Sequence, residues 1–396
     1  MNICGIICEY NPFHNGHLLH IEQTKKALNS GIVCVMSGNY VQRGSLALLH
    51  KRARAEAAIR SGADIVMELP VPWAISTAEH FAHGAVSLLN ALGTVTHLSF
   101  GAESENTDML QKVAEVLCDD AFDNRIMKHY KDGISYASAR EKAMSEINSD
   151  YAELLKSPNN ILGMEYLKSL IKLKSEILPF SVLRSGAGHD SSVHSDNIAS
   201  ASLIREKAHF GEDIAHFLPP MSSKIYEREL KEGHTLISKE ETDRAILISL
   251  KKLTAEDFLR FGDVSEGLQH RLFEAVAKCD TLDDAIGYAK TKRYTHARIR
   301  RCFLNAFLGI ENHLCRENVP YARILAFNSR GRDILKSSKK TSLIPIITKP
   351  AAIKKEDEKL YKLLALESRA DDIYSLFMKK NVGQGKTFTE SPVVID

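Results

Sequence analysis

Short apolar runs alternate with helical patterns along the first part of the chain, and this alternation limits the possible folds more than any other feature. Between the runs, apolar residues recur at helical spacing over residues 17–28, 51–61 and 76–92. The runs themselves suit strands that are buried on both faces, and they cover residues 3–8, 32–36, 64–69 and 94–100. This order predicts an α/β fold with a doubly wound parallel sheet, whose strand carboxyl ends meet at one ligand-binding edge.

The pattern changes further along the chain. Residues 107–177 look mainly helical, residues 179–183 suit a fifth strand, and residues 201–209 suit a short helix. After Pro219 and Pro220 the periodicity is mostly helical. We therefore predict an α/β domain over residues 1–220 and a mostly helical, basic domain over residues 221–396. The last residues, 383–396, lack periodicity, and we expect them to fray.

The segment that joins the first strand to the first helix carries the strongest chemical signal. It reads Glu-Tyr-Asn-Pro-Phe-His-Asn-Gly-His over residues 9–17. Gly16 allows backbone to approach a ligand closely, and the unpaired N–H groups at the helix start are suited to bind phosphate. The imidazoles of His14 and His17 can donate to phosphate oxygens as charge develops during displacement at an α-phosphate. The segment therefore predicts a nucleotide site in which His14 and His17 are catalytic.

Two other interpretations of this histidine pair remain. The first is a pair of core histidines beside a proline turn. The second is a zinc site, although no cysteine or carboxylate partner lies at a useful spacing. Because the sequence shows no dedicated carboxylate cage, we assign no metal ligands and expect Mg²⁺ to arrive with ATP.

Two short motifs resemble those of a known superfamily. His14-Asn15-Gly16-His17 looks like the HxGH signature of the nucleotidyltransferases. The stretch Ser-Ala-Ser-Leu-Ile-Arg over residues 200–205 resembles their second signature, with alanine at positions 199 and 201 as the departure. A serine can cap a helix start, and Arg205 adds a positive fork for outer phosphates. We therefore expect Ser202 and Arg205 to complete the ATP site, with Arg205 catalytic.

A longer set of motifs resembles the bacterial tRNA(Met) cytidine acetate ligase family, over essentially the whole chain. These motifs lie at residues 9–17, 37–44, 68–70 and 157–163, with weaker matches at 293–295 and 342–345. The resemblance implies that ATP and acetate form acetyl-adenylate, and that the acetyl group passes to N4 of the wobble cytidine of elongator tRNA(Met). It implies ATP contacts from Ile7, Cys8, Glu9, Tyr10, Asn11, Pro12, Phe13, His14, Asn15, Gly16, His17, Leu18, Leu19, His20, Gly101, Asn159 or Asn160, and Arg184.

Basic residues gather in one segment of a chain whose formal net charge is only +2. Residues 291–340 hold 12 Lys and Arg against three acidic residues, which predicts one surface for a polyanion. Exposed aromatics there could stack an unpaired base, although Phe303 and Phe307 fit core positions of a helix better. We expect RNA contacts from Arg43, Lys292, Arg293, Arg298, Arg300 and Arg301. Lys51 and Arg54 fit phosphate contact and a solvated helix face equally well.

No signal sequence opens the chain, and no apolar run approaches the ~18 residues of a membrane span. The seven scattered cysteines include no CxxC pair and suit a reducing compartment. We therefore expect a cytoplasmic protein whose partners are tRNA and acetate, with no membrane and no DNA. Two rival functions are a small-molecule adenylyltransferase or acid-activating ligase, and a non-catalytic RNA-binding protein with a vestigial nucleotide fold.

Overall fold

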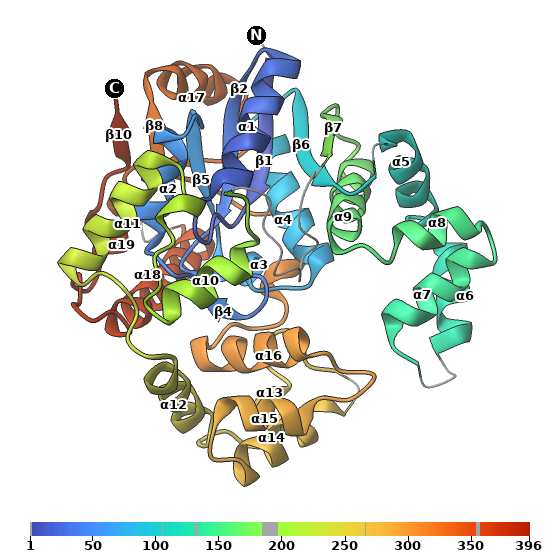
Figure 1. Cartoon of the computed structure of the whole chain (residues 1–396). Coiled ribbons are helices and arrows are strands. Elements are labelled where there is room, and N and C mark those ends of the chain that lie inside the picture. The colour runs from blue at the N-terminus through green and yellow to red at the C-terminus, as the bar shows by residue number, and fades with distance from the viewer. Residues whose placement is uncertain (1, 105, 131–133, 184–196, 266, 354–356) are drawn as a thin grey trace.

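In the computed structural model, a mixed sheet of eight strands lies at the centre of the molecule (Figure 1). The structure describes residues 2–104, 106–130, 134–183, 197–265, 267–353 and 357–396. The strand order is β10-β8-β5-β2-β1-β6-β7, with β9 paired to β8, and all pairs are parallel except β5 with β8. The strands are β1 (Asn2–Cys8), β2 (Ser30–Ser37), β5 (Ile65–Leu69), β6 (His97–Ala102), β7 (Leu178–Leu183), β8 (Ala322–Asn328), β9 (Ile346–Ile347) and β10 (Val393–Ile395).

Both faces of this sheet are covered, as the continuous apolar runs predict. Along β2, Ile32 and Cys34 point into one core, whereas Val33 and Val35 point into the other. The first core is covered by α1 (Asn15–Leu28), α2 (Lys51–Arg60), α10 (Ala201–His209) and α11 (Pro220–Glu232). The second is covered by α4 (Ala78–Ala91), α9 (Pro158–Lys172) and α17 (Ser329–Thr341). The predicted α/β class is therefore confirmed, with one antiparallel pair added.

Two helical units flank the sheet (Figure 1). The first consists of α5 (Thr107–Val116), α6 (Asp120–Tyr130), α7 (Tyr136–Ser145) and α8 (Ser149–Leu154), where helices were predicted. The second has its own apolar core and consists of α12 (Lys239–Leu250), α13 (Ala255–Phe258), α14 (Leu268–Lys278), α15 (Leu282–Ala289) and α16 (His296–Leu308). None of the helices in the described part of the chain has the length and apolar character needed to span a membrane.

The chain returns to the sheet after the second helical unit. Strand β8 pairs antiparallel with β5, and α18 (Glu358–Leu376) and α19 (Lys386–Thr389) follow it. The sheet therefore contains strands from both predicted domains, those before residue 220 and those after it. The prediction that residues 383–396 fray was wrong, because β10 pairs in parallel with β8 and places Val393 opposite Ala326. This segment has no periodicity of its own, and it is ordered because a neighbouring strand hydrogen-bonds to it.

Candidate ATP and RNA site

The loop between β1 and α1 is held by its own buried side chains at the carboxyl edge of the sheet. Tyr10 and Phe13 are 2% and 1% exposed and pack edge to face, with ring centroids 4.7 Å apart. The Tyr10 backbone has a φ of 47°, in the left-handed region, and its ring also packs edge to face on His17. The Asn11 side-chain oxygen accepts from the Leu48 N–H at 2.7 Å. The predicted ligand loop is therefore a fixed structure with buried aromatic rings beneath it.

His14 and His17 form the centre of the site. Their rings are stacked, with centroids 3.7 Å apart. His14 Nδ1 accepts from the Gly16 N–H at 3.1 Å, and His17 Nδ1 accepts from the His14 N–H at 3.3 Å, so the two residues cap the start of α1 reciprocally. Since each Nδ1 accepts a backbone N–H, each neutral ring carries its proton on Nε2. This geometry assigns both imidazoles the donor that a phosphate oxygen requires.

Gly16 lies directly against the first of these rings. A Cβ on Gly16 would be 3.0 Å from His14 Cε1 and 3.2 Å from His14 Nδ1. A larger residue at this position would therefore require the imidazole to shift by a few tenths of an ångström. This contact is a reason for glycine at position 16 within the protein itself, and the close approach of a ligand to Gly16 stays a prediction.

The second motif meets the first as predicted. Arg205 on α10 donates from Nη1 to the Asn11 carbonyl oxygen at 2.8 Å, and from Nη2 to Ser202 Oγ at 3.2 Å. Burial, opposed by the nearby Glu9 carboxylate, lowers the pKa of the Arg205 guanidinium. Ser200, rather than Ser202, caps the helix. The two motifs are 194 residues apart in sequence and form one site that contains a half-buried cation.

Asn159 and Asn160 lie where α9 begins, beside the end of β6. Asn160 Oδ1 accepts from the Glu103 N–H at 2.9 Å, and Asn159 Nδ2 donates to Glu103 Oε1 at 2.7 Å. The cap of this helix is Ser157, not one of the two asparagines. Gly101 is the second-last residue of β6 and pairs with Val182. Arg184 lies outside the described residues.

The remaining residues expected at the ATP site lie around this centre. Ile7 and Cys8 end β1 and are half-buried. Asn15 donates from Nδ2 to the carbonyl oxygens of Asn197 and His216, at 2.9 and 3.0 Å. His20 is hydrogen-bonded to Ser99 on β6 at 2.8 Å and faces the sheet, while Leu18 packs on the core below. Leu19 is half-buried on the same helix.

Possible metal ligands gather elsewhere. Among the described residues, the His, Cys and carboxylate groups that lie close enough together to hold an ion are Glu229, Glu232 and His234, on and after α11. Glu229 there already accepts from Arg228 at 2.7 Å. Neither His14 nor His17 belongs to that cluster.

The basic segment divides into exposed and structural residues. Lys292, Arg293 and Arg300 are exposed. Arg43 is exposed as well and lies in the turn between β3 (Tyr40–Val41) and β4 (Ser45–Leu46), a short antiparallel pair that follows β2. The Arg293 guanidinium lies over the Tyr130 ring, 4.8 Å from its centroid, and Nε donates to the Tyr130 hydroxyl at 2.7 Å. Arg300 Nη2 lies 3.8 Å from Asp283 Oδ1.

Arg301 differs from its expected surface role. It is 9% exposed and donates from Nε and Nη2 to Asp263 Oδ2, at 2.9 and 2.6 Å. Arg298 faces the same carboxylate, with its Nε 3.5 Å from Oδ1. These two arginines serve the packing of the helical unit because a carboxylate that is largely removed from water requires partners. The aromatics are mostly internal as well: Phe303, expected in the core, is 1% exposed, and Tyr294 and Tyr321 are buried too.

Arg54 is the residue that sequence reasoning assigned least well. It is 1% exposed, so neither phosphate contact nor a solvated face describes it. Its guanidinium donates to the carbonyl oxygens of Glu9 and Ser37, at 2.6 and 3.2 Å, and also to those of Gly38 and Leu49. Arg54 thereby joins the loops that follow β1 and β2. The alanine-rich surroundings of this arginine, which suit a buried helix face, are the signal that could have found it.

Comparisons with known proteins show the family of the chain. The family described as HIGH Nucleotidyl Transferase matches residues 1–388. The tRNA(Met) cytidine acetate ligase of Clostridium tetani (strain Massachusetts / E88) is 40% identical over 410 residues, which cover 100% of both chains. That of Alkaliphilus metalliredigens (strain QYMF) is 39% identical over 404 residues, covering 96% of this chain and 95% of the relative.

Two solved structures have the same fold throughout. The crystal structure of Thermotoga maritima TmcAL (apo, form I) has a TM-score of 0.95, and TmcAL bound with alpha-thio ATP (form II) has a TM-score of 0.93. Each is 32% identical in sequence, and each comparison covers 100% of both chains. The chain belongs to the tRNA(Met) cytidine acetate ligase family, within the HIGH nucleotidyltransferases.

Proposed function

We propose that the chain activates acetate with ATP and transfers the acetyl group to N4 of the wobble cytidine of elongator tRNA(Met), forming N4-acetylcytidine. The observation that carries this proposal is the stacked His14–His17 pair at the start of α1. The names of the relatives and the ATP-analogue complex of the Thermotoga maritima protein support it.

The residues of the site fit a nucleoside triphosphate. ATP supplies the adenylyl group that activates the acid, with release of pyrophosphate. The Nε2–H groups of His14 and His17 donate to oxygens on which negative charge grows, and the N-terminus of α1 adds backbone N–H groups. Arg205 supplies a fixed cation for the outer phosphates. Glu9 is occupied with the Gln42 N–H at 2.8 Å, and Mg²⁺ would therefore be held mainly by the phosphates themselves.

We place the RNA-binding surface on the second helical unit and on the loop at residues 37–44, which packs on it. Arg43, Lys292, Arg293 and Arg300 offer exposed positive charge. Arg298 and Arg301 contribute by holding α16 in place through Asp263. This unit lies within residues 221–396, the region expected to bind tRNA, and residues 1–220 supply the ATP motifs. Because the reaction uses ATP and tRNA, we also propose that the protein works in the cytoplasm.

The test is acid-dependent exchange between ATP and pyrophosphate with the purified protein and Mg²⁺. Acetate is compared with a panel of short acids, and wild type with His14→Ala. We expect exchange that requires acetate and disappears in the variant, followed by acetyl transfer to tRNA(Met). No exchange with any acid, even when bulk tRNA is present, would contradict the proposal. Exchange that depends on a mononucleotide or another small metabolite would favour a small-molecule adenylyltransferase.

A further inference from the structure

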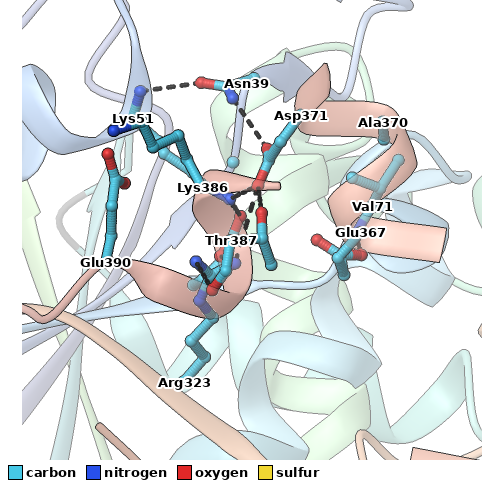
Figure 2. A network of polar contacts seen from close by, with 12 residues as sticks. Asn39, Lys51, Val71, Arg323, Glu367, Ala370, Asp371, Lys386, Thr387 and Glu390 are labelled. Carbon is cyan, nitrogen blue, oxygen red and sulfur yellow. Dashed lines mark hydrogen bonds and ion pairs between the residues drawn. The ribbon is translucent and has the colours of Figure 1, made fainter. Parts of the chain in front are cut away.

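A buried network of charged groups adjoins Asn39, which belongs to the loop that follows β2 (Figure 2). Lys51 Nζ lies 2.6 Å from Glu68 Oε1 on β5 and 2.5 Å from Asp371 Oδ2 on α18. Arg323 on β8 lies 2.9 Å from Glu68 Oε2. Lys51, Glu68, Asp371 and Arg323 are all less than 9% exposed. Two cations therefore face two carboxylates, and α18, late in the chain, contributes one of these groups to the centre of the α/β domain.

The network holds the loop through the side-chain amide of Asn39 and through the backbone of the loop. Asn39 Nδ2 donates to Asp371 Oδ1 at 2.8 Å, and Asn39 Oδ1 accepts from the Lys51 N–H at 2.8 Å (Figure 2). The Asn39 carbonyl oxygen accepts from the Ala47 N–H at 2.9 Å, beside the antiparallel pair of β3 and β4, so the loop is closed as a short hairpin. Gly38 lies against Glu68, since a Cβ there would be 2.5 Å from Oε1. The path of the loop is thus determined by groups that are far away in sequence.

The loop touches both halves of the proposed reaction. At its middle, the Gln42 N–H donates to Glu9 Oε1 in the ATP motif, at 2.8 Å. At its end, Gly44 has a φ of 77° and abuts α16: a Cβ on it would be 2.7 Å from Arg301 N and 2.8 Å from the Arg300 carbonyl carbon. The exposed Arg43 lies between these two contacts. A shift of the loop would therefore change how α16 sits relative to the ATP motif.

We propose that Asn39, Lys51, Glu68 and Asp371 are positioning residues, which fix the loop at residues 37–44 so that the RNA bound at α16 meets the activated acyl group. This inference rests on the proposed function. Buried ion pairs are a poor source of stability, because apolar residues of similar volume often stabilise a fold as well or better. Glu68 lies against Gly38, and Asp371 and the Lys51 N–H both hydrogen-bond the Asn39 side chain, and these contacts point to the loop as the element that the network positions.

The experiment compares two steps of the reaction in Asn39→Ala. Acetate-dependent ATP–pyrophosphate exchange reports on activation, and acetyl transfer to tRNA(Met) reports on the second step. We expect exchange close to wild type, but a rate of transfer about tenfold to hundredfold lower, since small misplacements at a distance from the chemistry have effects of that size. Thermal unfolding is measured alongside. If Asn39→Ala does not fold, Asn39→Ser, which keeps a polar group, gives the same comparison.

The matched control is Asp64→Asn, at the residue directly before β5, whereas Glu68 lies near the end of that strand. Asp64 is 2% exposed and accepts from the Ile32 N–H at 2.8 Å and from Asn328 at 3.0 Å, so its substitution also disturbs a buried carboxylate. It should lower the unfolding temperature and leave both steps unchanged. Equal losses of exchange and transfer in Asn39→Ala, or unchanged transfer, would overturn the positioning role. Wild-type protein that shows neither step would instead remove the proposed function itself.

Discussion

Glu367 on α18, next to the buried network, allows a direct test of whether one of the carboxyl groups there is protonated. The side chain is 1% exposed, and Oε1 accepts from the Val71 N–H at 2.7 Å. Burial, and then the charge of Glu68, raises the pKa of Glu367 to about 8. The carboxyl group is therefore mainly protonated at neutral pH and resembles an amide in shape and charge. We expect Glu367→Gln to fold and to keep the hydrogen bond to Val71.

The expected change in the free energy of unfolding follows from the ordinary pKa of a glutamate and the raised pKa of Glu367 in the folded protein. An acid with a raised pKa binds more protons in the folded than in the unfolded state, so the wild-type free energy of unfolding falls as the pH rises from the ordinary value of 4.5 through about 8. Each unit of pKa corresponds to about 1.36 kcal/mol, which makes the full loss about 5 kcal/mol at most. Glutamine does not titrate. The stability of the variant relative to wild type should therefore increase with pH across this window and then level off.

The assay is urea unfolding of both proteins, followed by circular dichroism at pH values that span 4.5 to 8. The control is Glu165→Gln, because Glu165 is also buried but lies 3.2 Å from Arg140 and 2.8 Å from Lys168. The Glu165→Gln substitution removes ion pairs, and it should destabilise the protein at every pH measured. A difference between Glu367→Gln and wild type that does not change with pH would refute a protonated Glu367.

Two further substitutions test the site and the basic segment. Gly16→Ala places a Cβ 3.0 Å from the His14 ring, so acetate-dependent exchange should fall about tenfold to hundredfold while circular dichroism stays unchanged; full exchange would show that the ring position does not matter. Asp263→Asn should lower the free energy of unfolding by about 1–3 kcal/mol, because the buried Arg301 loses its charged partner. The affinity of the Asp263→Asn protein for tRNA, measured by filter binding at fixed salt, should stay the same or increase because a negative charge is lost. Weaker binding would indicate that Asp263 orients the arginines for RNA.

The sequence by itself was sufficient for features that depend on neighbouring residues. The continuous apolar run of β1, the helical spacing of α1 and the glycine between His14 and His17 are local patterns, and the structure contains each where the sequence predicts it. The order of strands and helices gave the fold class for the same reason, since connection rules leave few alternatives. The family motifs added Arg205, which no local pattern would connect to residue 11.

Only the tertiary structure decided which charged side chains are internal. Lys51 meets Asp371 across 320 residues, and Arg301 meets Asp263 across 38, so no periodicity relates the partners. The antiparallel β8 and the terminal β10 joined the sheet for the same reason: their hydrogen bonds come from strands that are distant in sequence. A lysine on a surface and a lysine in a buried ion pair have the same local sequence signal. Burial depends on what the rest of the chain places around the residue, and that is decided when the fold closes.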